Sequence, residues 1–94
     1  MTEPDPDAGP AAPLPHQSLR TFQQNIDALY GDRDAARGVP STYMWFVEEV
    51  GELGRAIRKA DRENLLVEVG DVLAWLTTLA SLSGIDLEAV SYTH

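Results

Sequence analysis

The sequence predicts an all-α fold, a helical bundle that is completed by oligomerisation. Apolar residues recur at helical spacing along most of the chain, and β-branched residues do not alternate with polar ones as they do in strands. Short connections between the expected helices favour antiparallel neighbours in a bundle. The part of the chain that can fold, residues 18–94, is so small that burial between subunits is expected to supply part of its core.

Residues 1–17 differ in composition from the rest of the chain. They hold five of the six prolines together with Glu3, Asp5 and Asp7, and almost no side chain that could enter a core. Such a composition is typical of a disordered or extended segment. The sequence therefore divides into a tail over residues 1–17 and a helical domain over residues 18–94.

The first helix is expected to begin after Ser18, a good N-cap residue, and to end at Gly31. Residues 32–40 combine charged side chains with Gly38 and Pro40 and show no apolar periodicity. This composition predicts a loop between the first two helices.

Three further helices are expected after this loop. The second covers residues 40–60, because the proline at its start is favoured in a first helical turn and no breaker follows. The third covers residues 62–83, with Asp61 as its N-cap and Gly84 after its last turn. A short fourth helix covers residues 87–92.

The charge and the cysteine count exclude several classes of function. Acidic residues outnumber basic ones by 15 to 7, and a net charge of −8 repels nucleic-acid phosphates, so no nucleic-acid partner is expected. The absence of cysteine excludes disulfides and thiolate zinc sites. No secretory signal and no run of about 18 apolar residues is present, so a cytoplasmic protein without a membrane partner is expected.

The third expected helix carries two acids inside an apolar stripe. On a helical wheel, Glu68 and Asp71 lie among Val72, Trp75 and Leu79. The opposite side holds small residues that permit close helix contact, so this helix is expected to be buried nearly all round. Carboxylates in such a place must be protonated, paired with a base or neutralised by a cation.

The second expected helix carries an acidic face formed by Glu48, Glu49 and Glu52. Acids three residues apart on a helix, such as Glu49 and Glu52, bring their side chains close together. The apolar residues of this helix gather on a separate face that is expected to enter the core: Phe46, Val50, Leu53 and Ile57.

Two such acid pairs facing each other across antiparallel helices would form a cage of four carboxylates, from Glu49, Glu52, Glu68 and Asp71. Oxygen ligands suit hard divalent cations, and Mg²⁺ is usually shared between a few carboxylates and substrate phosphates. The spacing therefore indicates Mg²⁺, or Mn²⁺, and polyphosphate chemistry. Zinc is not expected, because the two histidines lie in the tail and at the last residue.

A second interpretation of these acids needs no metal. Glu52 can pair with Arg55 on the same helix, and Glu48 can be solvated, as most charged helix surfaces are. This interpretation does not extend to the acid pair of the third helix, whose nearest preceding base, Arg62, lies six residues before Glu68.

Two stretches of the chain resemble the MazG-like nucleotide pyrophosphohydrolases: WFVEEVGELGRAIRK and LLVEVGDVLAWLTTLASLSGIDLEAV. The hallmark of that family is ExxE, a variable spacer and ExxD. Here Glu49 and Glu52 form the first half, and Glu68 and Asp71 form the second, with fifteen residues between them. The flanking sequences agree as well, and the resemblance covers roughly residues 18–92.

The resemblance implies a MazG-like all-α bundle that assembles as a homodimer or a tetramer. It also implies a Mg²⁺-dependent enzyme that cleaves nucleoside triphosphates between the α and β phosphates, releasing a monophosphate and pyrophosphate, in nucleotide-pool house-cleaning. In the family the four matched acids bind the metals. Glu48 precedes the motif and is a candidate for orienting the attacking water. Alternatively, it contacts the metal ligands without binding the metal itself.

The substrate-binding side chains are less clear from the sequence. Family members commonly hold phosphates with basic residues in a fuller last helix, and none is present here, so Arg55 and Lys59 are the expected substitutes. The alternative is that these cations lie in solvent at the C-terminal end of the helix, where they offset its dipole. Trp45 lies one turn before Glu49, where it can stack on a nucleobase or form part of a core or an interface.

Three functions follow from these residues. The intact acid pairs favour a pyrophosphohydrolase. The absence of a basic last helix favours a catalytically weak MazG-like module that binds nucleotides or serves as an oligomeric interaction unit. A plain helical assembly domain requires that cations from another subunit pair with Glu68 and Asp71.

Overall fold

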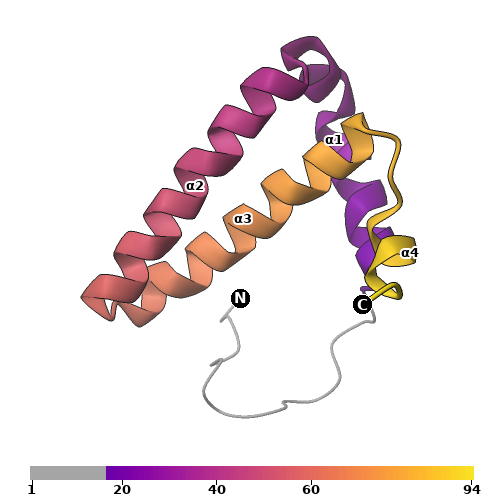
Figure 1. Ribbon diagram of the computed structural model, residues 1–94. Helices are drawn as coiled ribbons and strands as arrows, with labels where there is room; N and C mark the ends of the chain where they lie inside the picture. The colour runs from indigo at the N-terminus through magenta and orange to yellow at the C-terminus, as the bar shows by residue number, and fades with distance from the viewer. Residues whose placement is uncertain (1–16) are drawn as a thin grey trace.

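The computed structural model describes residues 17–94 and contains four helices (Figure 1): α1 (Leu19–Arg37), α2 (Val39–Lys59), α3 (Arg62–Leu82) and α4 (Leu87–Ser91). No strand occurs within these residues, which confirms the predicted all-α class. The long helices α2 and α3 form an antiparallel pair, and α1 packs against the C-terminal part of α3. The predicted tail lies outside the described residues, apart from Gln17.

Helix α1 is longer than the sequence suggested. It continues through Gly31 to Arg37, so the predicted loop over residues 32–40 is wrong. Arg37 donates to Asp34 at 3.0 Å, and Thr78 of α3 donates to the other carboxylate oxygen of Asp34 at 3.3 Å. The bond from Thr78 holds the last turns of α1 on α3, which offsets the low helix propensity of a glycine.

The turn between α1 and α2 consists of one residue. Gly38 has a φ angle of 82°, and α2 begins immediately after it at Val39. Glycine adopts this backbone conformation without the steric cost that a side chain would add. The chain therefore reverses direction at Gly38 rather than over a long loop.

The other helix boundaries agree closely with the sequence-based expectation. Asp61 caps α3 by accepting a hydrogen bond from the backbone N–H of Asn64 at 3.2 Å. Gly84 follows α3 with a φ angle of 70°. The fourth helix ends at Ser91 and its cap, Asp86, accepts from two backbone N–H groups of the first turn.

Polar side chains fasten α1 to the C-terminal end of the chain. The buried Gln23 donates to Ser81 Oγ at 2.9 Å and to the carbonyl of Ile85 at 2.8 Å. Its own amide oxygen accepts from the backbone N–H of Leu87 at 2.9 Å. Since Gln23 satisfies groups of α3, of the following turn and of α4, it fixes the position of α1 across all three.

The apolar face of α2 points away from α3. Val50 is 42% exposed and Ile57 is 60% exposed, whereas Thr42 and Ala56 are buried. The prediction that Phe46, Val50, Leu53 and Ile57 form the core face holds only in part, because Phe46 and Leu53 are half-buried whereas Val50 and Ile57 are exposed. The acid-bearing side of α2 is the one that meets α3, and part of the apolar side lies open.

Helix α3 is likewise not buried all round, contrary to the expectation from its sequence. Its small residues Thr77, Thr78 and Ala80 are buried, whereas Val67 is 57% exposed and Val69 is 53% exposed. The buried group lies where α1 packs. A single chain thus leaves apolar surface uncovered on both long helices.

With 21 residues, α3 is long and apolar enough to cross a membrane, by length and composition only. The expectation that the protein has no membrane partner stays a prediction. One such helix is weak evidence for a membrane, because core helices of soluble proteins can be equally long and apolar. Glu68 and Asp71 lie within this helix, and charges inside a bilayer are costly, which favours a protein partner for its apolar surface.

Candidate metal centre

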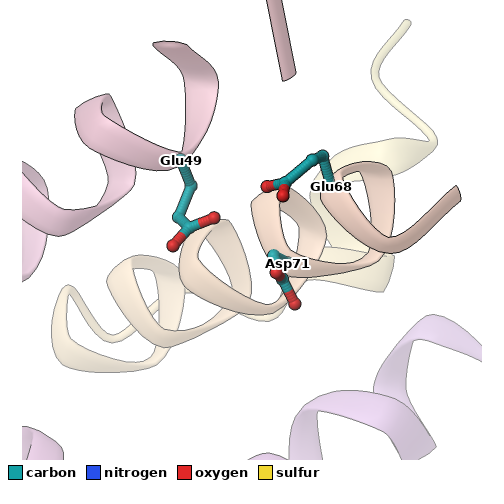
Figure 2. Close-up of side chains that lie close together, drawn as sticks. All are labelled: Glu49, Glu68 and Asp71. Carbon is teal, nitrogen blue, oxygen red and sulfur yellow. The ribbon is translucent and has the colours of Figure 1, made fainter. Parts of the chain in front are cut away.

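Carboxylates from α2 and α3 meet between the two helices. Glu49, Glu68 and Asp71 each offer one oxygen, and these three oxygens lie within 4.8 Å of one another. Figure 2 shows Glu49 reaching from α2 toward Glu68 and Asp71 on α3. We call this group the carboxylate cluster.

The helical repeat and the antiparallel pairing explain this convergence. Glu68 and Asp71 are three residues apart, so they lie on the same side of α3. Glu49 lies on the side of α2 that faces α3, which the burial of Ala56 two turns later also marks. The cluster thus requires both helices and the turn that joins them.

Two oxygens of the cluster lack partners. Oε2 of Glu49 and Oε2 of Glu68 are buried, and neither has a hydrogen bond within the described residues. Arg20 and Arg37 form ion pairs with other acids, so these two arginines do not neutralise either oxygen. Unpaired carboxylate oxygens away from water are costly, so this arrangement favours a bound cation or a proton.

The pKa of Glu49 is raised from 4.5 to about 7. Its burial is the largest cause, followed by the adjacent Glu68 carboxyl group and the charges of Glu52 and Asp71. All of these causes disfavour the ionised form, and a bound cation would act in the opposite direction. The electrostatics of the cluster therefore suit a site that exchanges a proton for a metal ion.

The donor set fits a hard divalent cation. It consists of carboxylate oxygens from three side chains and includes no imidazole or thiolate group. Oxygen ligands of this kind suit Mg²⁺, Mn²⁺ or Ca²⁺, and Mg²⁺ usually completes its coordination with waters or substrate phosphates. The cluster can hold such an ion and leave positions for a phosphate ligand.

Glu52, the fourth predicted metal ligand, lies beside this group of three. It borders a cavity of about 190 Å³ together with Glu68, and its charge contributes to the raised pKa of Glu49. Arg55 and Lys59, the predicted phosphate-binding residues, border the same cavity. Acid and base side chains thus meet at the end of the cluster that lies toward the α2–α3 turn.

Trp45 lies at the other end of the cluster. Its ring stacks on that of Trp75 across the helix pair, with centroids 6.2 Å apart and planes inclined by 14°. Glu48, the predicted water-orienting residue, is exposed and borders a separate hollow with Trp45, Ser41 and Met44. Glu48 is therefore not part of the carboxylate cluster.

Sequence reasoning missed Asp34 and Arg37, because both fall in the predicted loop. The guanidinium of Arg37 lies 4.9 Å from the centre of the Trp75 ring and is held there by Asp34. The spacing of three between Asp34 and Arg37 is itself a helical signal, which Gly31 and Gly38 obscured.

Comparison with known families agrees with this geometry. The model of the MazG nucleotide pyrophosphohydrolase domain matches residues 37–94, which include α2, α3 and α4 and hence both acid pairs. No curated protein matches the sequence. The family match covers more than half of the chain and confirms the resemblance that the ExxE and ExxD pairs indicated. The chain therefore belongs to the MazG nucleotide pyrophosphohydrolase domain family.

Proposed function

We propose that the protein is a Mg²⁺-dependent nucleoside triphosphate pyrophosphohydrolase that serves nucleotide-pool house-cleaning. It cleaves between the α and β phosphates and releases a nucleoside monophosphate and pyrophosphate. The observation that carries this proposal is the carboxylate cluster, which places buried, unpartnered oxygens of Glu49 and Glu68 beside Asp71 in a member of this family.

Glu49, Glu68 and Asp71 would hold the divalent ions, with Glu52 as a fourth ligand from the adjacent turn of α2. Ions bound there supply charge neutralisation to the phosphate oxygens and increase the acidity of water. The chain itself supplies ionised carboxylates, once Glu49 loses its proton, and two rigid helices that fix their spacing. No protein nucleophile is needed, so phosphoryl transfer depends on positioning and electrostatics.

The cationic side chains of α2 would hold the leaving phosphates. Arg55 and Lys59 border the cavity next to Glu68, on the side of the cluster toward the α2–α3 turn. We assign them to the β and γ phosphates, which carry most of the substrate charge. Glu48 is exposed one residue before Glu49, and we propose that it orients water from the solvent side.

We also propose that the protein is a homodimer or a tetramer. The exposed apolar residues of α2 and α3 lie on two long helices, and a second copy would remove them from water. Buried apolar residues of the described chain amount to Ala56 and Ala80, which is a small core for a stable fold. Self-association supplies the missing burial.

Product analysis tests the proposed reaction. The full chain is incubated with Mg²⁺ and a panel of nucleoside triphosphates, and the products are separated by ion-pair chromatography. Monophosphate and pyrophosphate in equal amounts support the proposal, whereas diphosphate and inorganic phosphate contradict it. Tight nucleotide binding without any product would favour a nucleotide-binding module that does not turn over its ligand.

A further inference from the structure

A second cavity lies between α1 and α3, on the far side of the carboxylate cluster from Arg55 and Lys59. It has a volume of about 210 Å³. Trp75, which borders it, follows Asp71 by one helical turn, or about 6 Å along the axis of α3. A nucleotide whose triphosphate binds at the cluster and at Arg55 and Lys59 can therefore extend its base toward this cavity.

The walls of this cavity suit a flat aromatic ring. Tyr30 and Trp75 contribute aromatic surface, and the guanidinium groups of Arg33 and Arg37 lie over these rings at 5.9 and 4.9 Å from their centres. Aromatic and guanidinium planes both stack well on nucleobases. A bare phosphate would gain little from these apolar walls, so the lining favours a base.

The polar groups of the cavity mostly donate hydrogen bonds. The two carboxylate oxygens of Asp34 are engaged, one by Arg37 at 3.0 Å and the other by Thr78 at 3.3 Å. Arg33 contacts the Tyr30 ring and forms no ion pair within the described residues. A guanidinium offers several N–H donors and no acceptor, so a ligand that binds Arg33 in this cavity must present acceptor atoms.

We propose that this cavity receives the nucleobase of the substrate and selects 6-oxopurines, with Arg33 as the residue that reads the base edge. This inference rests on the proposed function for the placement of the triphosphate. Guanine and hypoxanthine present O6 and N7, the two acceptors that an arginine fork matches. Adenine presents an amino group where O6 would be, and that donor would face the donors of Arg33.

The test compares two ligands that share ring size and differ at the purine 6-position. Binding of the α,β-methylene analogues of inosine and adenosine triphosphate to the full chain is measured by titration calorimetry with Mg²⁺ present. We expect the inosine analogue to bind more tightly by about fivefold to a hundredfold, the range for a good arginine–base pair. Arg33→Ala should reduce this ratio to near one.

Two controls separate base recognition from other effects. Inorganic tripolyphosphate has no base, so its affinity should be the same for the wild type and Arg33→Ala. Arg58→Ala removes an exposed arginine from the last turn of α2, away from the cavity, and should keep the inosine preference. Because Arg33 is exposed and has no ion pair within residues 17–94, its alanine variant should retain the helical circular dichroism of the wild type.

Equal affinities for the two analogues, no binding of either, or a preference that survives in Arg33→Ala would each overturn the base site. The hydrolysis assay reports on the proposed function separately. An Arg33-dependent inosine preference without pyrophosphate release retains the base site and rejects the hydrolase. Pyrophosphate release with equal kcat/KM for inosine and adenosine triphosphates retains the hydrolase and rejects the base site.

Discussion

Glu49 on α2 and Glu68 on α3 each direct a buried carboxylate oxygen into the space between the helices, and neither oxygen has a hydrogen-bond partner there. Asp71 adds a third carboxylate oxygen within 4.8 Å. The side on which α2 and α3 face each other thus carries like charges, whereas apolar side chains such as Val50 and Ile57 are exposed. Such an arrangement costs stability unless a proton or a cation compensates it.

The stability of the metal-free protein should depend on pH through Glu49. Its pKa rises from 4.5 to about 7 on folding, so between these values the folded state binds more protons than the unfolded state. Stability should therefore fall as pH increases through this window, and the loss should be complete above about pH 7. Urea unfolding in EDTA at several pH values measures the slope, and Glu49→Gln should reduce it. A wild-type slope that Glu49→Gln leaves unchanged would show that another group is responsible.

Neutralising Glu68 should abolish hydrolysis without unfolding the protein. Glu68→Gln removes one charge from a crowded cluster, which relieves repulsion, and it also removes a ligand that the metal requires. Pyrophosphate release should be lost, whereas the melting temperature without divalent ions should stay the same or rise. Glu63→Gln, an exposed acid five residues earlier on α3, is the matched control and should remain active. Loss of helicity in Glu68→Gln would indicate a structural ion pair instead.

Self-association should depend on the exposed apolar face of α2. Sedimentation at micromolar concentration should give a mass at least twice 10.3 kDa. Ile57→Glu should shift the protein toward a monomer, because a charge at a residue that is 60% exposed in one chain becomes costly only when a partner covers it. Tyr92→Glu, after the end of α4, should leave the mass unchanged. A stable wild-type monomer would contradict the proposed assembly.

Local signals in the sequence predicted the helix boundaries where a cap or a breaker acts alone. Asp61 and Gly84 mark the ends of α3 because an N-cap and a left-handed glycine depend on neighbouring residues. Gly31 misled the prediction, because the contacts of Asp34 with Arg37 and Thr78 keep the helix intact beyond it. The contact with Thr78 joins residues 44 positions apart, and helical periodicity carries no such information.

Helical spacing predicted that Glu68 and Asp71 share a side of α3, and Glu49 meets them as expected. The same wheel could not show which side of α2 would face α3. The apolar side was expected to enter the core, yet Val50 and Ile57 are exposed and the acidic side faces α3. An amphipathic helix reveals its faces but not its partners, and within residues 17–94 part of the apolar face of α2 stays uncovered.

A thermal shift with divalent ions tests the central claim, that the carboxylate cluster is a metal site, most directly. An ion that binds only the folded state stabilises it by about 2.7 kcal/mol at a concentration a hundredfold above its Kd. The Tm of the wild type should therefore rise with millimolar Mg²⁺ or Mn²⁺ beyond its value in monovalent salt of equal ionic strength. The double variant Glu49→Gln, Asp71→Asn should lose that additional rise, and its Tm should still respond to monovalent salt as the wild type does. An equal Tm for the wild type in Mg²⁺ and in matched monovalent salt, with a nucleotide analogue present, would contradict the account.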